Sequence, residues 1–144
     1  MTLYCDPTAD GSMLLALKDG KRLVGIHRLM LRRGDHENVL PRMLRFLKSM
    51  ASEISDIREI VVVRGPGRFS SLRVMAVIAN MLAWSYGCRL FAVKRPSIVT
   101  DDARYLTVLD HAKLRVRRVV PLYGRPPSIT APLKRQAGTF KDVG

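Results

Sequence analysis

The chain has 144 residues, 47% of them hydrophobic, and carries 25 Lys and Arg against 12 Asp and Glu. This length predicts one domain with its own core, and the hydrophobic content excludes a disordered chain. The net charge of +13 favours a polyanion such as nucleic acid as a partner, with a general basic bias as the alternative.

The apolar runs and the two cysteines indicate where the protein is found and whether it binds a metal. No run reaches about 18 uninterrupted apolar residues, and residues 1–9 lack the basic start and long apolar run of a signal peptide. Cys5 and Cys88 lack metal-ligand spacing and favour free thiols in a reducing compartment. We therefore expect a cytoplasmic protein without a membrane span or a metal site.

The first part of the chain predicts three short strands joined by turns. Turn residues at 9–12 separate the first two apolar runs, and Asp19-Gly20 is a hairpin signal between the second and the third. Strands joined this closely form an antiparallel meander. The predicted strands are residues 3–6, 13–17 and 23–31.

An amphipathic helix is predicted over residues 36–51, with Asp35 as its N-cap. Its apolar side chains fill an arc of roughly 160° on a helical wheel, opposite three basic residues. His36 has no second ligand at helical spacing, so we do not expect it to bind a metal. The apolar arc is formed by Val39, Leu40, Met43, Leu44, Phe46, Leu47 and Met50.

A buried strand, a glycine-rich turn and a second helix follow. The β-branched run at 60–64 predicts the strand, and its helical connection favours parallel pairing with the first strand. Residues 65–73 read Gly-Pro-Gly-Arg-Phe-Ser-Ser-Leu-Arg, and Ser70 or Ser71 is expected to cap the helix at 70–86. The turn lacks the Gly-Lys-Ser/Thr ending of a P-loop, so we expect a structural role, with a phosphate cradle as the alternative.

This turn resembles a family signature. Gly-Pro-Gly-x-Phe-Thr-Gly-Leu-Arg after a β-branched strand is characteristic of the bacterial TsaB (YeaZ) family, whose members serve in making threonylcarbamoyladenosine on tRNA. Ser70 replaces the usual Thr, and Ser71 replaces a Gly. The resemblance extends to a fifth strand, expected at 88–93. The signature residues taken as a structural loop are Gly65, Pro66, Gly67, Phe69 and Arg73. We expect a positive φ at Gly65 or Gly67, and we expect Phe69 to anchor the turn in the core.

The resemblance implies a fold and the absence of catalysis. The fold would be α/β: an actin-like ATPase or ribonuclease H-like lobe, with a five-stranded mixed sheet and two main helices on one face. In sugar kinases and their relatives, an Asp at the end of the first strand faces nucleotide phosphates, and Asp6 has that place. TsaB proteins are regarded as degenerate members of this group of kinase-like proteins that do not catalyse a reaction at this site. We therefore interpret Asp6 as a turn residue and expect no cofactor.

The second helix predicts a surface for another protein. Between residues 72 and 84 only Arg73 and Asn80 are clearly polar. A helix that is apolar nearly all round must be covered all round, by a partner or by a larger core of the same chain. We expect a partner. The predicted interface residues are Leu40, Met43, Leu44, Leu47, Met75, Ala79 and Leu82.

The remaining chain divides the protein into three expected parts. Residues 1–96 form the TsaB-like N-terminal lobe. Residues 97–130 form a remnant of a second lobe, with a β-hairpin from 104–109 and 114–120 and a segment similar to the Pro-x-Tyr-x-Arg-x-Pro that often closes TsaB chains. Residues 131–144 form a flexible basic tail. The resemblance at both ends implies that most of the second lobe is deleted.

The end of the chain is basic. From residue 111 to residue 141 there is no acidic residue, and alternation along the predicted strand places Arg115 and Arg117 on one exposed face. We expect tRNA contacts here, with a solvated basic surface as the alternative. The candidate contacts are Lys113, Arg115, Arg117, Arg118, Lys134 and Arg135.

Three functions follow. The first is a non-catalytic subunit of the threonylcarbamoyladenosine-forming complex, which scaffolds a TsaD-type catalytic subunit beside a TsaE-type ATPase, meets tRNA through the complex and forms a homodimer when alone. The second is a small basic nucleic-acid-binding protein with a degenerate kinase-like fold. A working ATPase or sugar kinase ranks last, because a second phosphate loop and the second lobe are missing. No histidine lies in a catalytic triad pattern.

Overall fold

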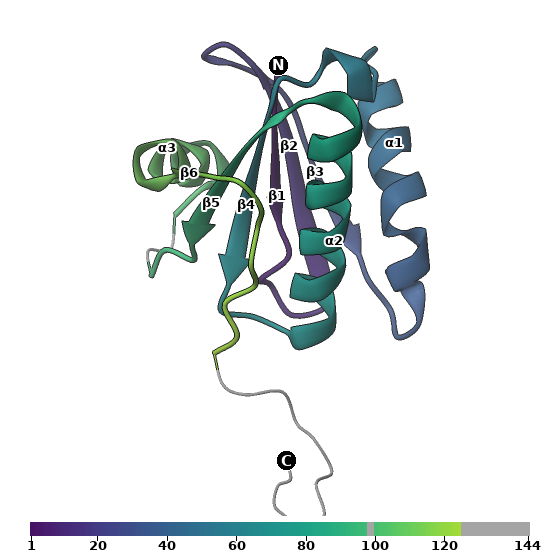
Figure 1. Cartoon of the computed structure of the whole chain (residues 1–144), viewed down its shortest axis with the longest axis vertical. Helices are drawn as coiled ribbons and strands as arrows, with labels where there is room; N and C mark the ends of the chain where they lie inside the picture. The colour runs from purple at the N-terminus through teal and green to yellow at the C-terminus, as the bar shows by residue number, and fades with distance from the viewer. Residues whose placement is uncertain (98–99, 125–144) are drawn as a thin grey trace, which may run out of the picture.

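One mixed sheet of six strands, in the order β3-β2-β1-β4-β5-β6, forms the centre of the molecule (Figure 1). The computed structural model describes residues 1–97 and 100–124. The elements are β1 (Thr2–Asp6), β2 (Ser12–Asp19), β3 (Arg22–Met30), η1 (Asp35–Asn38), α1 (Val39–Ser49), η2 (Ile54–Asp56), β4 (Glu59–Gly65), α2 (Phe69–Tyr86), β5 (Arg89–Lys94), α3 (Asp102–Ala112) and β6 (Leu114–Val116).

The first three strands form the predicted antiparallel meander. β1 pairs with β2, which places Tyr4 opposite Ala16, and β2 pairs with β3. The turn between β2 and β3 contains Gly20 at φ +62°, a conformation that other residues adopt only with strain. β1 and β2 are apolar almost throughout because both of their faces are covered.

Strands β4 and β5 run parallel to β1, also as predicted. A helix precedes each of them and brings the chain back to the end of the sheet where β1 begins, so the next strand runs in the same direction. The carboxyl ends of the three parallel strands therefore meet at one end of the sheet. Asp6, Gly65 and Lys94 are the last residues of these strands.

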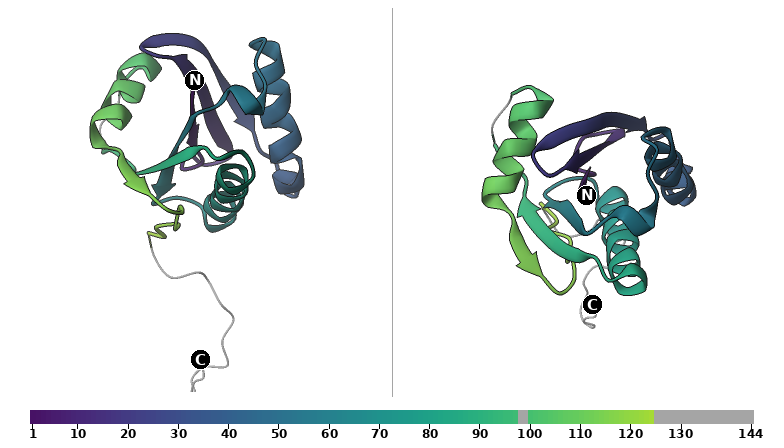
Figure 2. Two further views of the ribbon diagram at one scale, coloured as in Figure 1. Left: turned by 45° about the horizontal axis from the view of Figure 1, so that its top comes forward. Right: turned by 90° about the horizontal axis from the view of Figure 1, so that it is seen from above.

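Helices cover both faces of the sheet (Figures 1 and 2). α1 and α2 lie side by side on one face, as predicted, and α3 lies on the other. The larger core cluster joins Leu3 of the sheet to Met43 of α1 and Met75 of α2. The smaller cluster joins Val61 of the sheet to Leu106 of α3.

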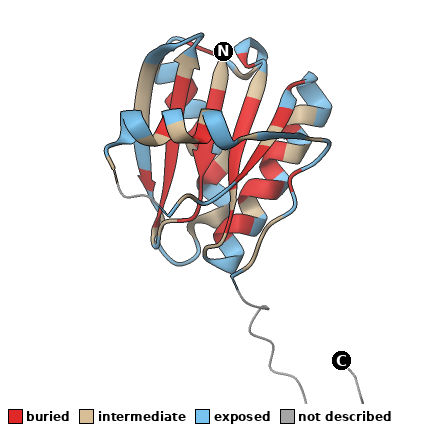
Figure 3. Ribbon diagram, turned by 90° about the vertical axis from the view of Figure 1, so that its left-hand side faces the viewer, coloured by how far each residue is buried: buried red, intermediate tan, exposed pale blue. Residues whose placement is uncertain are grey.

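The predicted C-terminal hairpin is wrong, and the sheet has six strands rather than five. Residues 104–109 lie within α3, and the strand predicted at 114–120 is reduced to β6, which pairs antiparallel with β5. Leu106 and Leu109 have the spacing of one helix face, and both are buried against the strands that Figure 3 shows behind α3. Asp101 caps this helix, because its side chain accepts a 2.9 Å hydrogen bond from a backbone amide of the first turn.

Candidate functional site

The signature loop lies at the carboxyl end of β4, and two of its glycines are required by close contacts. Gly65 has φ +134°, and a Cβ built on it would lie 2.0 Å from the carbonyl oxygen of Leu122. A Cβ on Gly67 would lie 2.9 Å from Cα of Thr8. The expectation of a positive φ at Gly65 or Gly67 is confirmed at Gly65, where only glycine fits both the backbone angle and the contact.

The other signature residues lie nearer the surface. The peptide bond before Pro66 is cis. Phe69 was expected to anchor the turn in the core, which is wrong: its side chain is 38% exposed and its ring lies 4.5 Å from that of Tyr123. Arg73 is exposed on α2. The loop is therefore covered by the segment that follows β6 rather than by the core.

The expected serine cap of α2 is also wrong. The helix begins at Phe69, and Arg68 occupies the N-cap without a side-chain hydrogen bond to the helix. Ser70 is exposed, whereas the buried Ser71 lies one turn too late and its Oγ is 3.4 Å from Nε2 of His36. The first-turn amides of α2 thus keep no side-chain cap among the described residues.

Residues 119–123, which we call the strap, lie against α2 and the signature loop. Asn80 of α2 holds it twice: Asn80 donates to the carbonyl of Val119 at 3.1 Å and accepts from the amide of Val119 at 2.7 Å. Further along, the amide of Leu122 donates to the carbonyl of Arg64 at 2.7 Å. These bonds explain why residues 119–123 lie against the loop although the strand ends at Val116.

Asp6 forms the turn at the end of β1, as interpreted from the sequence. Its Oδ1 accepts hydrogen bonds from the amide and the hydroxyl of Thr8, at 2.9 and 2.5 Å. Its Oδ2 accepts a short hydrogen bond from the hydroxyl of Tyr105 on α3. Burial and the neighbouring Asp6 carboxylate raise the pKa of Tyr105, so this hydroxyl keeps its proton and remains a donor.

A cavity of about 480 Å³ opens beside Asp6, at the carboxyl end of the sheet. Its walls come from the ends of β1 and β3, from the signature loop, from the segment after β5 and from α3. Arg28 and Arg95 supply positive charge, and Asp102 lies 3.8 Å from Arg28. Sequence analysis did not single out Arg28, Arg95 or Tyr105, because the residues come together only when α3 folds over the sheet.

The predicted partner interface is mostly buried inside this chain. Leu44 is exposed and Leu40 is partly buried. The others point from α1 and α2 toward the sheet, where the chain's own core covers them, so they are not accessible to a partner. These buried residues are Met43, Leu47, Met75, Ala79 and Leu82.

A different set of apolar side chains faces outward. On α2, Val77, Met81 and Trp84 are exposed by 61, 42 and 88%. Their spacing of four and three residues places them along one side of the helix. Leu44 of α1 is exposed as well. We call Val77, Met81 and Trp84 the outer stripe.

The candidate RNA contacts have different environments. Arg115, Arg117 and Arg118 are exposed. Lys113 is partly buried, 3.7 Å from Glu59 and 3.5 Å from Asp110, so its charge is already balanced. Lys134 and Arg135 lie outside the described residues, as do the expected basic tail and the segment from residue 125.

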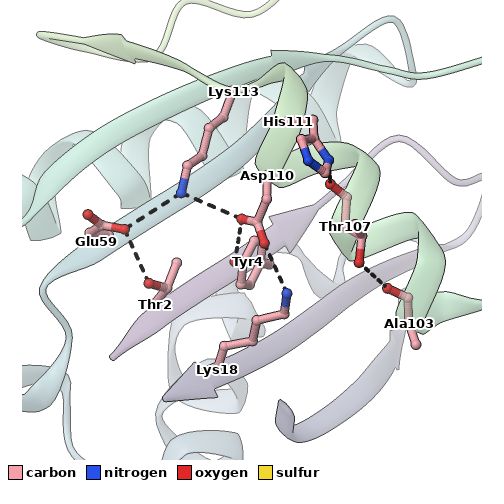
Figure 4. Close-up of polar contacts among 9 residues, drawn as sticks. All are labelled: Thr2, Tyr4, Lys18, Glu59, Ala103, Thr107, Asp110, His111 and Lys113. Carbon is pink, nitrogen blue, oxygen red and sulfur yellow. Dashed lines mark hydrogen bonds and ion pairs between the residues drawn. The ribbon is translucent and has the colours of Figure 1, made fainter. Parts of the chain in front are cut away.

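A polar cluster fixes the end of α3 to the sheet (Figure 4). Asp110 accepts hydrogen bonds from the hydroxyl of Tyr4 at 2.6 Å and from Nζ of Lys18 at 2.9 Å. Burial opposes ionisation of Asp110, but the bonds from Tyr4 and Lys18 and the charges of Lys18 and Lys113 outweigh it and lower its pKa. This cluster is structural, because its polar groups are directed at one another.

The described residues contain no metal-ligand cluster, no helix suited to crossing a membrane and no disulfide. Residues 1–97 and 100–124 contain no group of three or more His, Cys, Asp or Glu side chains that could hold a metal ion. None of the helices in this part of the chain is long and apolar enough to cross a membrane. Cys5 and Cys88 are both buried free thiols, as expected.

Comparison with known proteins identifies the family. The family model described as TsaD, tRNA N6-adenosine threonylcarbamoyltransferase, matches residues 18–105, which is more than half of the chain. A tRNA threonylcarbamoyladenosine biosynthesis protein, TsaB of Bacillus subtilis (strain 168), is 23% identical over 105 residues. The chain belongs to the TsaB (YeaZ) family.

Solved structures of the TsaB (YeaZ) family show the same fold. YeaZ from Pseudomonas aeruginosa superposes with a TM-score of 0.57 at 24% identity over 65% of this chain and 43% of that chain. A Pseudomonas aeruginosa protein described by its similarity to peptidase YEAZ gives a TM-score of 0.58 at 24% identity, over 65% of this chain and 42% of that one. The match to the Bacillus protein covers 73% of this chain but 46% of the relative, so the chain spans less than half of the curated relative's length.

Proposed function

We propose that the chain is a non-catalytic subunit of the complex that forms threonylcarbamoyladenosine on tRNA, where it docks a TsaD-type catalytic subunit. The observation that carries this proposal is the outer stripe. Trp84 is 88% exposed, next to Met81 and Val77 on a helix that is otherwise packed on its own sheet. Exposed apolar side chains gathered around a tryptophan are typical of protein interfaces.

The neighbouring helix extends this surface. α1 lies beside α2 on the same face of the sheet, and its Leu44 is also exposed (Figure 2). Two adjacent helices offer a ridged surface into which two helices of a partner can pack. We therefore propose a four-helix interface with the TsaD-type subunit. A TsaE-type ATPase and tRNA would join through the complex, in the cytoplasm, and the same surface would form a homodimer when the partner is absent.

The environment of Asp6 supports a non-catalytic role. Both of its carboxylate oxygens already accept hydrogen bonds, from Thr8 and from Tyr105. The side chain is 9% exposed, so little of it can reach a ligand in the adjacent cavity. A general base must come within hydrogen-bond reach of the proton that it takes, and the bonds from Thr8 and Tyr105 already occupy most of the accepting sites of this carboxylate. ATP hydrolysis by the purified chain, abolished by Asp6→Ala, would contradict this proposal.

The extent of the chain is part of the proposal. We assign residues 1–96 to the N-terminal lobe of the family and residues 97–130 to what remains of the second lobe. Support comes from the family model, whose match ends at residue 105, and from the relatives, of which the chain covers less than half. α3 and β6 pack on the first lobe's own sheet, so this part adds to the lobe instead of forming another.

A second candidate is a small basic nucleic-acid-binding protein. The observation that favours it is the net charge of +13. Nucleic-acid binding by a chain that captures no TsaD-type protein from its own cell would support it. The two functions are therefore separated by whether the chain has a protein partner.

Co-purification tests the proposal. A variant with Val77→Glu and Trp84→Glu should keep its fold, because both positions are exposed, and should no longer co-purify with the TsaD-type protein of the same cell. Thr107→Glu on α3 is the control, because it adds charge to an exposed helix position on the opposite face of the sheet. The mass of the chain alone should also fall from dimer to monomer in the stripe variant. Undiminished partner binding by the stripe variant would overturn the proposed surface.

A further inference from the structure

The cations at the two ends of the sheet differ in whether they are paired. At the end where β4 and β5 begin, cations meet partly buried carboxylates: Arg89 lies 2.8 Å from Glu59, and Lys18 lies 2.9 Å from Asp110. Figure 4 shows Lys18 and Lys113 directed at these carboxylates. The charges of Lys18, Arg89 and Lys113 are therefore balanced within the chain, whereas Lys21 and Arg58 at the same end are exposed and have no carboxylate oxygen of the described residues within 4.0 Å.

At the carboxyl end of the parallel strands the cations have fewer partners. Arg32, Arg33 and Arg95 are exposed, and no carboxylate oxygen of the described residues lies within 4.0 Å of their side-chain nitrogens. Two other arginines have only exposed carboxylates as ion-pair partners: Arg28 lies 3.8 Å from Asp102, and Arg68 lies 3.2 Å from Asp10. Arg28 also donates a hydrogen bond to the hydroxyl of Ser12 at 3.4 Å. Exposed pairs of this kind contribute little and can exchange partners. We call Arg28, Arg32, Arg33, Arg68 and Arg95 the basic rim.

The basic rim borders two cavities, and residues 8–11 and the signature loop contribute to the walls of both. These two segments, which we call the ridge, touch through the close contact of Gly67 with Thr8 and the ion pair of Arg68 with Asp10. The first cavity is the one of 480 Å³, lined in part by Arg28 and Arg95. The second has a volume of about 500 Å³.

The second cavity is lined by donors without a carboxylate. Its walls are Gly11, Leu31, Arg32, Arg33, Gly34, His36, Arg68, Ser70 and Ser71. Guanidinium groups match phosphate oxygens in a paired geometry, and hydroxyl groups add further donors. Arg68, Ser70 and Ser71 belong to the N-cap and the first turn of α2, where no side chain of the described residues caps the helix. A negatively charged group would therefore be stabilised from several elements at once.

We propose that the basic rim binds the phosphodiester backbone of a structured RNA. A repeating polyanion can place phosphates on both sides of the ridge, whereas a single small anion would meet the cations of one cavity only. The choice of RNA rests on the proposed function, in which tRNA is the substrate of the complex. Contact with phosphates alone would make the binding independent of sequence and weaker at high salt.

The rim is better placed for this role than the C-terminal strand. Lys113 is engaged by Glu59 and Asp110, and the guanidinium of Arg115 lies 6.0 Å from the ring centre of Phe91, within cation–π range. Of the three arginines that line the second cavity, Arg32 and Arg33 have neither kind of partner among the described residues, and Arg68 pairs with the exposed Asp10. Arg117 and Arg118 are exposed and have neither kind of partner among the described residues either, but they line neither of the two cavities. We therefore place the RNA contact on the rim rather than on residues 113–118.

A salt series with a matched pair of variants tests the rim. The full chain, without partner proteins, is titrated with a tRNA transcript at several salt concentrations, as wild type, as Arg32→Ala with Arg33→Ala, and as Arg115→Ala with Arg117→Ala. Each double variant removes two exposed positive charges. The rim variant should lose affinity by roughly tenfold or more, and the slope of log affinity against log salt should become shallower by roughly 1.5. The strand variant, Arg115→Ala with Arg117→Ala, should keep most of the wild-type affinity and most of the wild-type salt slope.

Four outcomes would overturn the proposal. The first is an equal loss in the two double variants, which would mean diffuse charge, and the second is no loss in the rim variant. The third is full displacement of the RNA by ATP at the same total phosphate concentration and ionic strength, which would assign the rim to a free nucleotide. The fourth is co-sedimentation with phosphatidylserine vesicles without RNA binding, which would assign it to a membrane surface.

The same variants separate this inference from the proposed function. The rim variant should still co-purify with the TsaD-type subunit, because its residues lie away from the outer stripe. The stripe variant should still bind tRNA with the wild-type salt slope. Loss of partner binding alone concerns the interface, and loss of RNA binding alone concerns the rim.

Discussion

The hydroxyl of Tyr105, near the middle of α3, donates a hydrogen bond to the carboxylate of Asp6 at the end of β1. The two residues are 99 positions apart in the sequence. This contact ties the helix on the second face to the strand at the centre of the sheet, and it completes the hydrogen bonding of Asp6.

Tyr105→Phe should lower the free energy of unfolding by about 1–3 kcal/mol, because it leaves one oxygen of a buried carboxylate without a partner. Thr107→Ala is the control: its hydroxyl is exposed and bonds only to a backbone carbonyl of the same helix, so we expect a change within about 0.5 kcal/mol. Urea unfolding of the two variants provides the measurement. Equal stability would show that the Tyr105 hydroxyl contributes nothing to the docking of α3.

Asp110→Asn should destabilise the protein at neutral pH and much less in acid. The lowered pKa means that the ionised Asp110 stabilises the folded state above its ordinary pKa of about 4, and this contribution is lost as the pH falls through the lowered folded value. We expect a loss of about 1–2 kcal/mol at pH 7 after allowing for solvent screening. Unfolding measured at pH 7 and near pH 3 checks the difference. Asp19→Asn, whose pair with Arg22 is exposed, is the control, and a loss that does not depend on pH would contradict the expected role.

Gly65→Ala should be far more destabilising than Gly20→Ala. Both glycines have a positive φ, but a Cβ at residue 65 would also lie 2.0 Å from the carbonyl oxygen of Leu122, whereas nothing lies within 4 Å of one at residue 20. We expect a loss of about 1–2 kcal/mol at residue 20 from backbone strain alone, and a larger loss or insoluble protein at residue 65. Melting temperatures and soluble yield are the measurements. Similar values for both variants would show that the strap does not press on the signature loop.

Met43→Glu and Val77→Glu should separate the core side of the helix pair from its outer side. Met43 is 1% exposed, so a glutamate there buries an unpaired charge and should cost several kcal/mol. Val77 is 61% exposed, and the same change should alter stability by no more than about 0.5 kcal/mol. Circular dichroism during thermal unfolding distinguishes the two. An unstable Val77→Glu variant would show that the outer stripe belongs to the fold.

Much of the first lobe was predictable because its signals are local. The apolar runs at 3–6, 13–17 and 60–64 and the turn at Gly20 predicted strands and connections that the structure contains. The amphipathic pattern predicted α1, and the glycine-rich turn placed the start of α2 within one residue. The missed helix α3 also had a local signal, since Asp101 precedes a segment in which Leu106 and Leu109 share one helix face.

The candidate site was less predictable than the fold. An apolar helix such as α2 has no polar side to mark its orientation, so Met75 and Val77 could not be assigned to the core or the surface. The structure buries Met75 and exposes Val77. The basic rim was missed for a related reason, because its arginines come from three separate segments of the chain, at residues 28–33, 68 and 95.

The sequence by itself determined the order of the first five strands and two helices, the glycine at residue 65 and the family. These depend on side-chain periodicity, turn chemistry and a contiguous signature, all of which are written along the chain. Only the tertiary structure decided which cations remain unpaired and that the hydroxyl of Tyr105 donates a hydrogen bond to Asp6. Both depend on distances between residues far apart in the sequence, and the packing of α3 against the sheet sets those distances.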